Sequence, residues 1–222
     1  MIILKDVTKF YKTEHGKNYI LKNINITLPD ENIGILGRNG AGKSTMMRML
    51  GGIEFPNKGK IISSNSFSWP LGLSGGFVGK MTGRSNVKFV SRLYGKNRQA
   101  TNDIITFVQE FSELNTYFDM PIKTYSSGMK SRLSFGLSLA FNFDYMLIDE
   151  TLSVGDAKFR KKAKNALLDK IQNCYILLVS HDMKILQELC TAGLLLHDGQ
   201  LFYYKDINDA ILHYQDINKG KK

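Results

Sequence analysis

Cysteine is scarce and long apolar runs are absent in this sequence of 222 residues. Its two cysteines, Cys174 and Cys190, lie in apolar stretches and are expected to be core residues of a reduced compartment rather than a disulfide or a redox centre. Apolar runs such as 145–148 and 175–179 are far too short to span a bilayer, and the N-terminus shows no secretory signal pattern. We therefore expect a cytoplasmic protein.

Acidic residues are outnumbered by basic ones. The chain has 30 Lys and Arg against 20 Asp and Glu, which gives a net charge of +10. Such an excess indicates an anionic partner, which could be a nucleotide, acidic lipid headgroups, nucleic acid or an acidic polymer. Because the basic residues are dispersed and form no known binding module, nucleic acid is not expected to be the main partner. The length suits a single α/β domain over residues 1–222.

The apolar pattern predicts strands and helices around a helical insertion. Residues 85–127 are mostly helical in pattern and precede a helix at 128–141, so a helical subdomain at about 84–141 is expected within the α/β core. Another helix is predicted at 156–172. The segment 12–18 reads as a loop or hairpin turn, and Asp198-Gly199 as a two-residue hairpin turn. The predicted strands are 2–4, 24–28, 32–36, 61–62, 145–148, 175–179, 194–196 and 201–204.

The segment 37–45 is the most informative, because it reads G-x-x-x-x-G-K-S-T between an apolar strand and an apolar helical pattern. In such a segment the glycines let backbone N–H groups turn toward phosphate oxygens. Lys43 would neutralise the β- and γ-phosphates of a nucleoside triphosphate, and Ser44 would ligate Mg²⁺. The alternative is a glycine-rich turn that binds nothing. The expected nucleotide-binding residues here are Gly37, Asn39, Gly40, Ala41, Gly42, Lys43, Ser44 and Thr45.

Two carboxylates, Asp149 and Glu150, follow a buried strand, at the end where open α/β sheets hold their ligands. Asp149 would hold Mg²⁺ through its water shell, and Glu150 would orient and deprotonate the attacking water. A helix N-cap followed by an acid in the first turn would explain the pair equally well. The phosphate loop upstream favours the catalytic interpretation.

Two further segments belong to the same hypothesis. Tyr125-Ser126-Ser127-Gly128-Met129 opens a helix, and helix N-termini bind anions, although a plain capped helix start would look the same. His181 follows the strand 175–179, so it is expected at the same sheet edge as Asp149. A histidine there could also be purely structural, but its place beside the other motifs favours a site residue.

These motifs, in this order, resemble those of ATP-binding-cassette ATPases, and the resemblance covers nearly the whole chain. It implies a P-loop NTPase of that type: a RecA-like core, an N-terminal antiparallel β subdomain and an inserted α-helical subdomain, with ATP and Mg²⁺ bound. By the resemblance, Tyr11 stacks on adenine, 153–156 is the D-loop and His181 is the switch histidine. Two copies would pair head to tail, so that the signature residues Ser126, Ser127 and Gly128 of one copy meet the γ-phosphate held by Lys43 of the other.

Segments between the motifs, such as 68–73, 82–84, 111–129 and 154–159, resemble the ATP-binding subunit of bacterial group 2 capsular polysaccharide exporters. This implies ATP-driven export of capsular polysaccharide across the inner membrane by a dimer at its cytoplasmic face. The partners would be a polytopic membrane subunit and periplasmic and outer-membrane export components, with the polysaccharide contacted only indirectly. The alternatives are a teichoic acid or O-antigen exporter, a soluble cassette ATPase and a non-hydrolysing regulator, which Glu150 disfavours. An additional C-terminal carbohydrate-binding domain is not expected.

The sequence departs from the family pattern in two places. Residues 61–81 contain no Gln, although such cassettes place a Mg²⁺-reaching Gln there, and the signature reads Ser-Ser-Gly-Met instead of Ser-Gly-Gly-Gln. The glycine-rich loop 69–81 is nevertheless expected to dock the membrane subunit. Beside it, Arg84, Lys88, Arg92 and Lys96 are predicted to form a basic stripe on one helix, which could equally be a solvated face without a partner.

Overall fold

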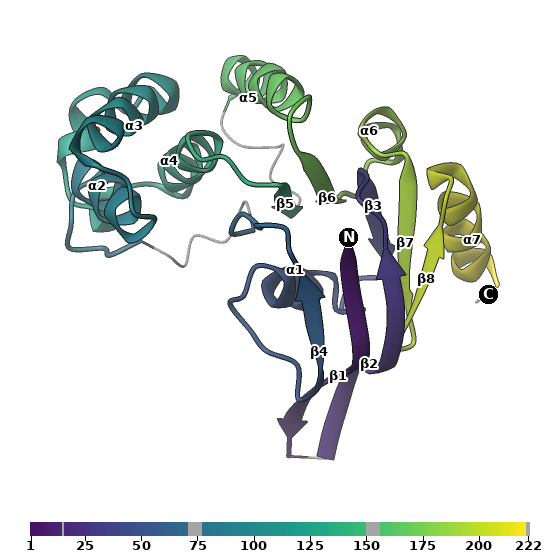
Figure 1. Ribbon diagram of the computed structural model, residues 1–222. Helices are drawn as coiled ribbons and strands as arrows, with labels where there is room; N and C mark the ends of the chain where they lie inside the picture. Colours follow the sequence, from purple (N-terminus) through teal and green to yellow (C-terminus); the bar gives the residue numbers. More distant parts are fainter. Residues whose placement is uncertain (15, 71–76, 150–155, 221–222) are drawn as a thin grey trace. The chain divides into compact units, whose positions relative to one another are not determined.

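The computed structural model describes residues 1–14, 16–70, 77–149 and 156–220, and they fall into two compact units (Figure 1). The first unit draws its residues from Met1–Pro70, Phe143–Glu150 and Asn173–Lys222. The second draws them from Leu71–Asn142 and Thr151–Gln172. Each unit therefore combines segments that are far apart in the sequence.

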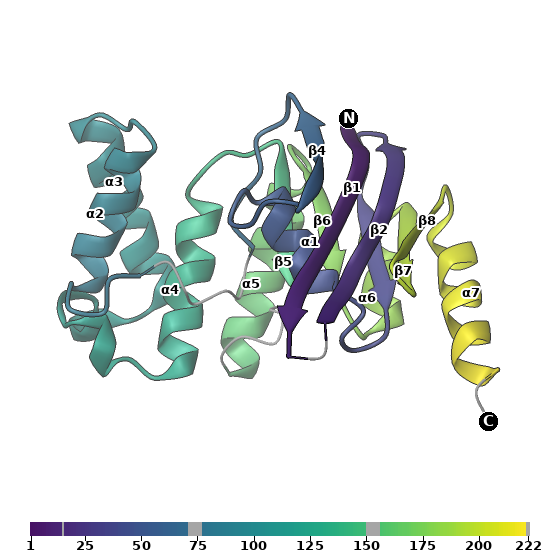
Figure 2. The same ribbon diagram turned by 90° about the horizontal axis from the view of Figure 1, so that it is seen from below.

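The first unit contains an antiparallel sheet with the strand order β2-β1-β4, whose strands lie side by side in Figure 2. The strands are β1 (Ile2–Thr13), β2 (Gly16–Leu28) and β4 (Lys58–Ser63). Ile2, Leu4 and Val7 are buried on one face of the sheet. Strand pairing continues up to Thr13 and Gly16, so much of the expected loop 12–18 is strand, and Glu14 lies in a turn. Backbone pairing extends β1 and β2 beyond the apolar pattern from which they were predicted.

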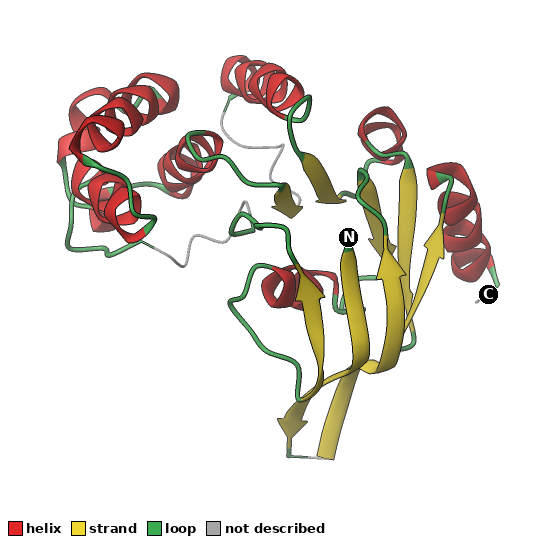
Figure 3. Ribbon diagram, viewed as in Figure 1, coloured by secondary structure: helices red, strands yellow, loops and turns green. Residues whose placement is uncertain are grey.

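The same unit holds a five-stranded sheet with the order β5-β6-β3-β7-β8. Its first four strands are parallel and β8 runs antiparallel to β7, as the arrows in Figure 3 show. Asp198 (φ 48°) and Gly199 (φ 82°) form the predicted two-residue turn between β7 and β8. The parallel strands are buried on both faces, which explains their continuous apolar runs. The strands are β3 (Ile33–Gly37), β5 (Tyr145–Asp149), β6 (Tyr175–Val179), β7 (Ala192–His197) and β8 (Gln200–Tyr204).

Three helices belong to the first unit: α1 (Lys43–Leu50), α6 (Met183–Leu189) and α7 (Ile207–Lys219). The sequence analysis predicts α1 but neither α6 nor α7. Helix α7 packs on β3 and β7, where two strand residues are glycines. A Cβ atom at Gly193 would lie 2.2 Å from Cβ of Ala210, and one at Gly34 would lie 2.7 Å from Cδ1 of Ile207. The absence of side chains at these glycines lets α7 approach the sheet.

The second unit is helical in its described residues. It comprises α2 (Gly83–Leu93), α3 (Arg98–Ser112), α4 (Ser127–Leu139), α5 (Ala157–Lys170) and two short 3₁₀ turns, Asn115–Asp119 and Ile122–Thr124. Phe111 of α3 joins the helices, because its ring contacts those of Phe135 and Phe159. The predicted α/β class with helices inserted between core segments is confirmed, whereas the subdomain limits of about 84–141 stay a prediction. Of the cysteines, Cys190 is buried as expected, but Cys174 is only half-buried.

Candidate functional site

The glycine-rich loop joins β3 to α1 and closes around the side chain of Lys43. Its ammonium donates hydrogen bonds to the carbonyl oxygens of Gly37 (2.8 Å) and Arg38 (3.2 Å), and only 8% of the residue is exposed. Gly40 (φ 81°) and Gly42 (φ 107°) adopt the left-handed backbone that glycine accepts most readily. The loop therefore holds a positive charge at the strand end and at the start of a helix.

Two glycines of this loop differ in the room beside them. Among the described residues, a Cβ atom at Gly40 would meet nothing within 4 Å, so the described part of the chain leaves the backbone there open. A Cβ atom at Gly42 would instead lie 2.2 Å from Cγ2 of Ile20 on β2. Gly42 is also the N-cap of α1 and provides no side-chain hydrogen bond to the first turn. Helix N-termini with uncapped N–H groups attract anions, which is the chemistry expected of the segment 37–45.

The strand ends place two other predicted residues beside this loop. Asp149 ends β5 and is paired in register with Val179 of β6, which in turn lies next to β3. His181 follows β6 by two residues and is exposed, in a turn before the N-cap of α6, Asp182. Parallel strands present their carboxyl ends on one edge of the sheet, so Asp149, His181 and Gly37 share that edge. Glu150 and the predicted D-loop residues 153–155 lie outside the described residues.

The predicted signature residues lie in the second unit, at the start of α4. Ser126 is the N-cap, and its hydroxyl oxygen accepts a hydrogen bond from the N–H of Met129 at 3.2 Å. This is the geometry of the simpler alternative, a capped helix start. An accepting hydroxyl still carries a proton to donate, so it can also bind a phosphate oxygen. Within the described part of the chain, a Cβ atom at Gly128 would meet only the Ser126 hydroxyl, at 3.9 Å, so these residues leave the helix start open on that side.

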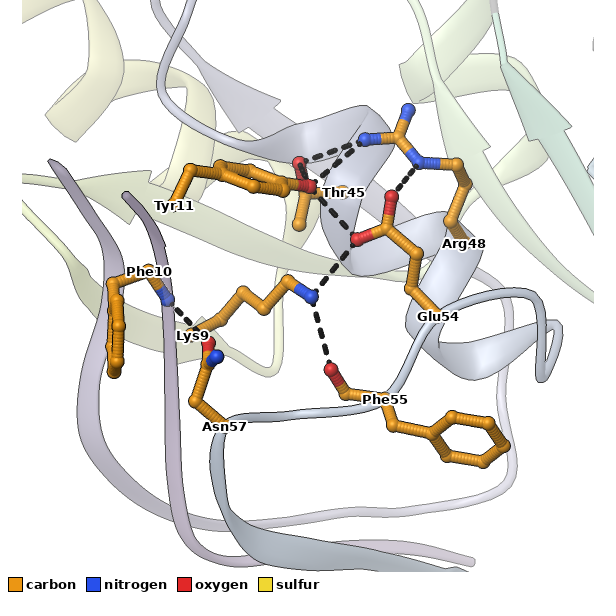
Figure 4. Close-up of polar contacts among 8 residues, drawn as sticks. All are labelled: Lys9, Phe10, Tyr11, Thr45, Arg48, Glu54, Phe55 and Asn57. Carbon is orange, nitrogen blue, oxygen red and sulfur yellow. Dashed lines mark hydrogen bonds and ion pairs between the residues drawn. The ribbon is translucent and has the colours of Figure 1, made fainter. Parts of the chain in front are cut away.

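Tyr11 has more polar contacts than the sequence analysis predicts for an aromatic ring that stacks on a base (Figure 4). Its hydroxyl donates to Oε2 of Glu54 at 2.8 Å and lies 3.2 Å from Oγ1 of Thr45. Arg48 donates from Nε to Glu54 at 2.7 Å and from its terminal nitrogen to Thr45 at 3.1 Å. Lys9 completes the cluster with an ion pair of 3.1 Å to Glu54. Sequence reasoning missed Glu54 because no motif marks it.

The predicted basic stripe is wrong as a row of four side chains. Arg84 forms an ion pair of 2.6 Å with Asp119 and lies over the ring of Phe118, so it serves the packing of the second unit. Helix α2 ends at Leu93, which leaves Lys96 beyond it. Lys88 and Arg92 remain, exposed on α2. The middle part of the predicted docking loop, residues 71–76, lies outside the described residues.

Comparison with known proteins identifies the family. The family profile described as "ABC transporter" matches residues 21–153, which is more than half of the chain. The chain belongs to the ABC transporter family. The resemblance seen in the motifs is thereby confirmed, including the ATP-binding-cassette fold and the membership of a family of nucleotide-binding ATPases.

Three relatives show where this cassette stands within the family. It is 53% identical to the polysialic acid transport ATP-binding protein KpsT of Escherichia coli, over 97% of this chain and 99% of that protein. It is 42% identical to the capsule polysaccharide export ATP-binding protein CtrD of Neisseria meningitidis serogroup B, over 98% and 100%. It is 37% identical to the teichoic acids export ATP-binding protein TagH of Bacillus anthracis, over 97% of this chain but 39% of that protein. The capsule export subunits are therefore the nearer relatives.

A solved structure supports the fold. The cassette MJ0796, in a dimeric post-hydrolysis state bound to ADP and Pi, matches with a TM-score of 0.76 over 93% of this chain and 99% of that chain, at 23% identity. Among the described helices of this cassette, none is long and apolar enough to cross a membrane.

Proposed function

We propose that this chain is the ATP-hydrolysing subunit of a transporter that exports capsular polysaccharide across the bacterial inner membrane. One observation carries the proposal. A phosphate-binding loop closed around Lys43 occurs in a chain that is 53% identical, over almost its whole length, to a polysialic acid transport ATP-binding protein.

ATP hydrolysis is assigned to the loop and the sheet edge. Residues 37–45 bind the phosphates, with Lys43 as the cation and the open backbone at Gly40 as the cradle. Ser44 and Asp149 are the oxygen ligands suited to Mg²⁺, which when bound supplies charge neutralisation at the phosphates. Glu150 accepts the proton of the water that attacks the γ-phosphorus, and the bond from that phosphorus to the ADP oxygen breaks. His181 lies at the same edge as a further polar group facing the γ-phosphate.

A second copy of the chain completes the site. The start of α4, with Ser126, Ser127 and Gly128, offers a hydroxyl and helix N–H groups to the γ-phosphate bound by Lys43 of the other copy. The open side of Gly128 supports this role, since a ligand can approach the backbone there. Two sites would then lie between two copies paired head to tail.

A membrane partner is supported by exposed apolar side chains on α2. Phe89 is 48% exposed and Leu93 is 71% exposed, and they lie among the exposed Lys88 and Arg92. Apolar side chains flanked by cations suit a protein surface close to a membrane. The partner would be a polytopic membrane subunit, so this chain would work peripherally at the cytoplasmic face. Periplasmic and outer-membrane components would carry the polysaccharide onward.

The experiment that tests this function is complementation. In a capsulated bacterium that lacks its export ATPase, the wild-type chain should restore polysaccharide at the cell surface, and Lys43→Ala should not. Lys161→Ala, which changes an exposed lysine of α5, is the matched control and should restore export. Normal surface polysaccharide with Lys43→Ala at equal protein level would contradict the proposal. Restoration of surface teichoic acid or O-antigen in a strain that lacks the ATPase of that exporter, without restoration of capsule in the first strain, would favour those alternative exporters.

A further inference from the structure

We propose that Glu54 and Lys9 are positioning residues for the nucleotide base: they hold the ring of Tyr11 by its hydroxyl and by one face, leaving the other face for a purine. The inference rests on the proposed nucleotide site, and it adds two residues to which no motif points. Its evidence is the cluster drawn in Figure 4.

Glu54 holds the edge of the ring. Its Oε2 accepts the hydrogen bond of the Tyr11 hydroxyl at 2.8 Å, and its other oxygen accepts from Nε of Arg48 at 2.7 Å. Lys9 reaches the same carboxylate at 3.1 Å and also donates to the carbonyl oxygen of Phe55 at 2.9 Å. With two cations and one hydroxyl on it, the carboxylate is a fixed acceptor. Charge-assisted hydrogen bonds of this kind are shorter and stronger than neutral ones.

The charge state of Glu54 agrees with this role. Burial alone would raise the pKa of its carboxyl, but the hydrogen bonds from Tyr11, Arg48 and Lys9 outweigh burial and lower that pKa below its ordinary value. The carboxylate is therefore ionised at neutral pH, and the Tyr11 hydroxyl donates to a charge.

Lys9 holds one face of the ring. Lys9 and Tyr11 are two residues apart on β1, so both side chains lie on the same face of the sheet. The Lys9 ammonium lies 5.1 Å from the centre of the Tyr11 ring, within the range of a cation–π contact. Lys9 is buried, whereas Tyr11 is 37% exposed. Since the cation covers one face, a base can stack only on the other.

The cluster also fixes the ring relative to the phosphate site. The Tyr11 hydroxyl lies 3.2 Å from Oγ1 of Thr45, the residue after Ser44 in the first turn of α1, and Arg48 donates to both. The base platform and the start of α1 are thus joined by direct hydrogen bonds. A tyrosine ring already ordered in this way loses little conformational freedom when a base stacks on it.

The test separates the contribution of the base to binding from the contribution of the phosphates. Isothermal titration calorimetry on the full chain would measure dissociation constants for Mg-ATP and for Mg-tripolyphosphate, which has no base. Tyr11→Phe keeps the ring and removes the tether, Glu54→Gln removes the charge, and Lys9→Met removes the ammonium but keeps the stem. Lys5→Met, at an exposed lysine of the same strand, is the matched control.

Each of the three variants should weaken ATP binding about three- to tenfold and leave tripolyphosphate binding unchanged. The double variant of Tyr11→Phe and Glu54→Gln should bind ATP no more weakly than the worse single variant, because both substitutions act on the same hydrogen bond. Equal losses for ATP and tripolyphosphate would overturn the positioning role, and so would unchanged ATP binding by Tyr11→Phe and Glu54→Gln. If the wild-type chain bound neither compound, the nucleotide site itself would fail, and this inference with it.

Discussion

The ammonium of Lys43 donates a 2.8 Å hydrogen bond to the carbonyl oxygen of Gly37, the last residue of the strand that enters the phosphate loop. The lysine is thereby held at the mouth of its own loop, and the bond ties the strand end to the start of α1. A cation fixed in this position needs little rearrangement to meet phosphate oxygens.

Lys43→Ala should weaken ATP binding by at least about tenfold, because a hydrogen bond to a charged group contributes roughly 1.5–3 kcal/mol. Calorimetric titration of the purified chain with Mg-ATP would measure the change. Lys161→Ala serves as the control for a lost surface charge. Equal affinities of Lys43→Ala and the wild type would show that the phosphates bind elsewhere.

Glu150→Gln should keep ATP binding and slow steady-state hydrolysis by about 10²-fold or more, because the amide cannot accept the proton of the attacking water. Phosphate release by the chain together with its membrane partner is the measurement. Binding of ATP by the same variant, measured by titration, controls for damage to the site. Hydrolysis at the wild-type rate would remove Glu150 from the role of base.

Gly193→Ala should destabilise the first unit by about 1–3 kcal/mol, since the new Cβ would lie 2.2 Å from Cβ of Ala210 and force α7 away from the sheet. Urea denaturation would give the free energy of unfolding. Gly220→Ala is the control, because its nearest contact, at 3.5 Å, is an ordinary one. A Gly193→Ala protein as stable as the control would mean that α7 is not packed as described.

Acid should destabilise the cluster around Glu54. The folded-state pKa of Glu54 is lowered from 4.5, so its stabilising effect is fully present above about 4.5 and is lost as pH falls through the lowered value. The melting temperature should therefore decrease less between pH 7 and pH 3.5 for Glu54→Gln than for the wild type. Glu14→Gln, at an exposed residue just after β1, should keep the wild-type dependence of the melting temperature on pH. The same dependence of the melting temperature on pH in all three proteins would contradict the prediction.

Removing the apolar surface of α2 should uncouple export from hydrolysis. The double variant Phe89→Ser and Leu93→Ser should reduce surface polysaccharide while the basal ATPase activity of the isolated chain stays unchanged, because neither residue is one of those assigned to nucleotide binding or hydrolysis. Replacing Lys88 and Arg92 with Gln should also reduce surface polysaccharide if α2 lies near anionic headgroups. Normal export by both double variants would show that this surface of α2 is solvated and has no partner.

The sequence predicts the parallel core well because its strands are buried on both faces and read as unbroken apolar runs. The phosphate loop and the turn Asp198-Gly199 were predictable for a different reason, since the backbone torsions at those turns favour particular residues. Helix α7 was not, because its approach to the sheet depends on glycines of two neighbouring strands, and one of them, Gly34, lies far from it in the sequence. The contacts of Tyr11 with Glu54 and Arg48 were not predicted either, because these residues are far apart in the sequence and only the tertiary structure brings them together.

Ile20 on β2 leaves no room for a side chain at position 42, whereas no described residue comes within 4 Å of a side chain's first carbon at position 40. A saturation scan of the loop would therefore meet two kinds of intolerance. Position 40 would be limited by its backbone torsion and by the ligand, while position 42 would also be limited by a hairpin from the other sheet. Shortening the side chain at 20 would widen the choice at 42 and leave 40 unchanged. The residues permitted at 20 and 42 thus constrain each other over evolutionary time, independently of the nucleotide.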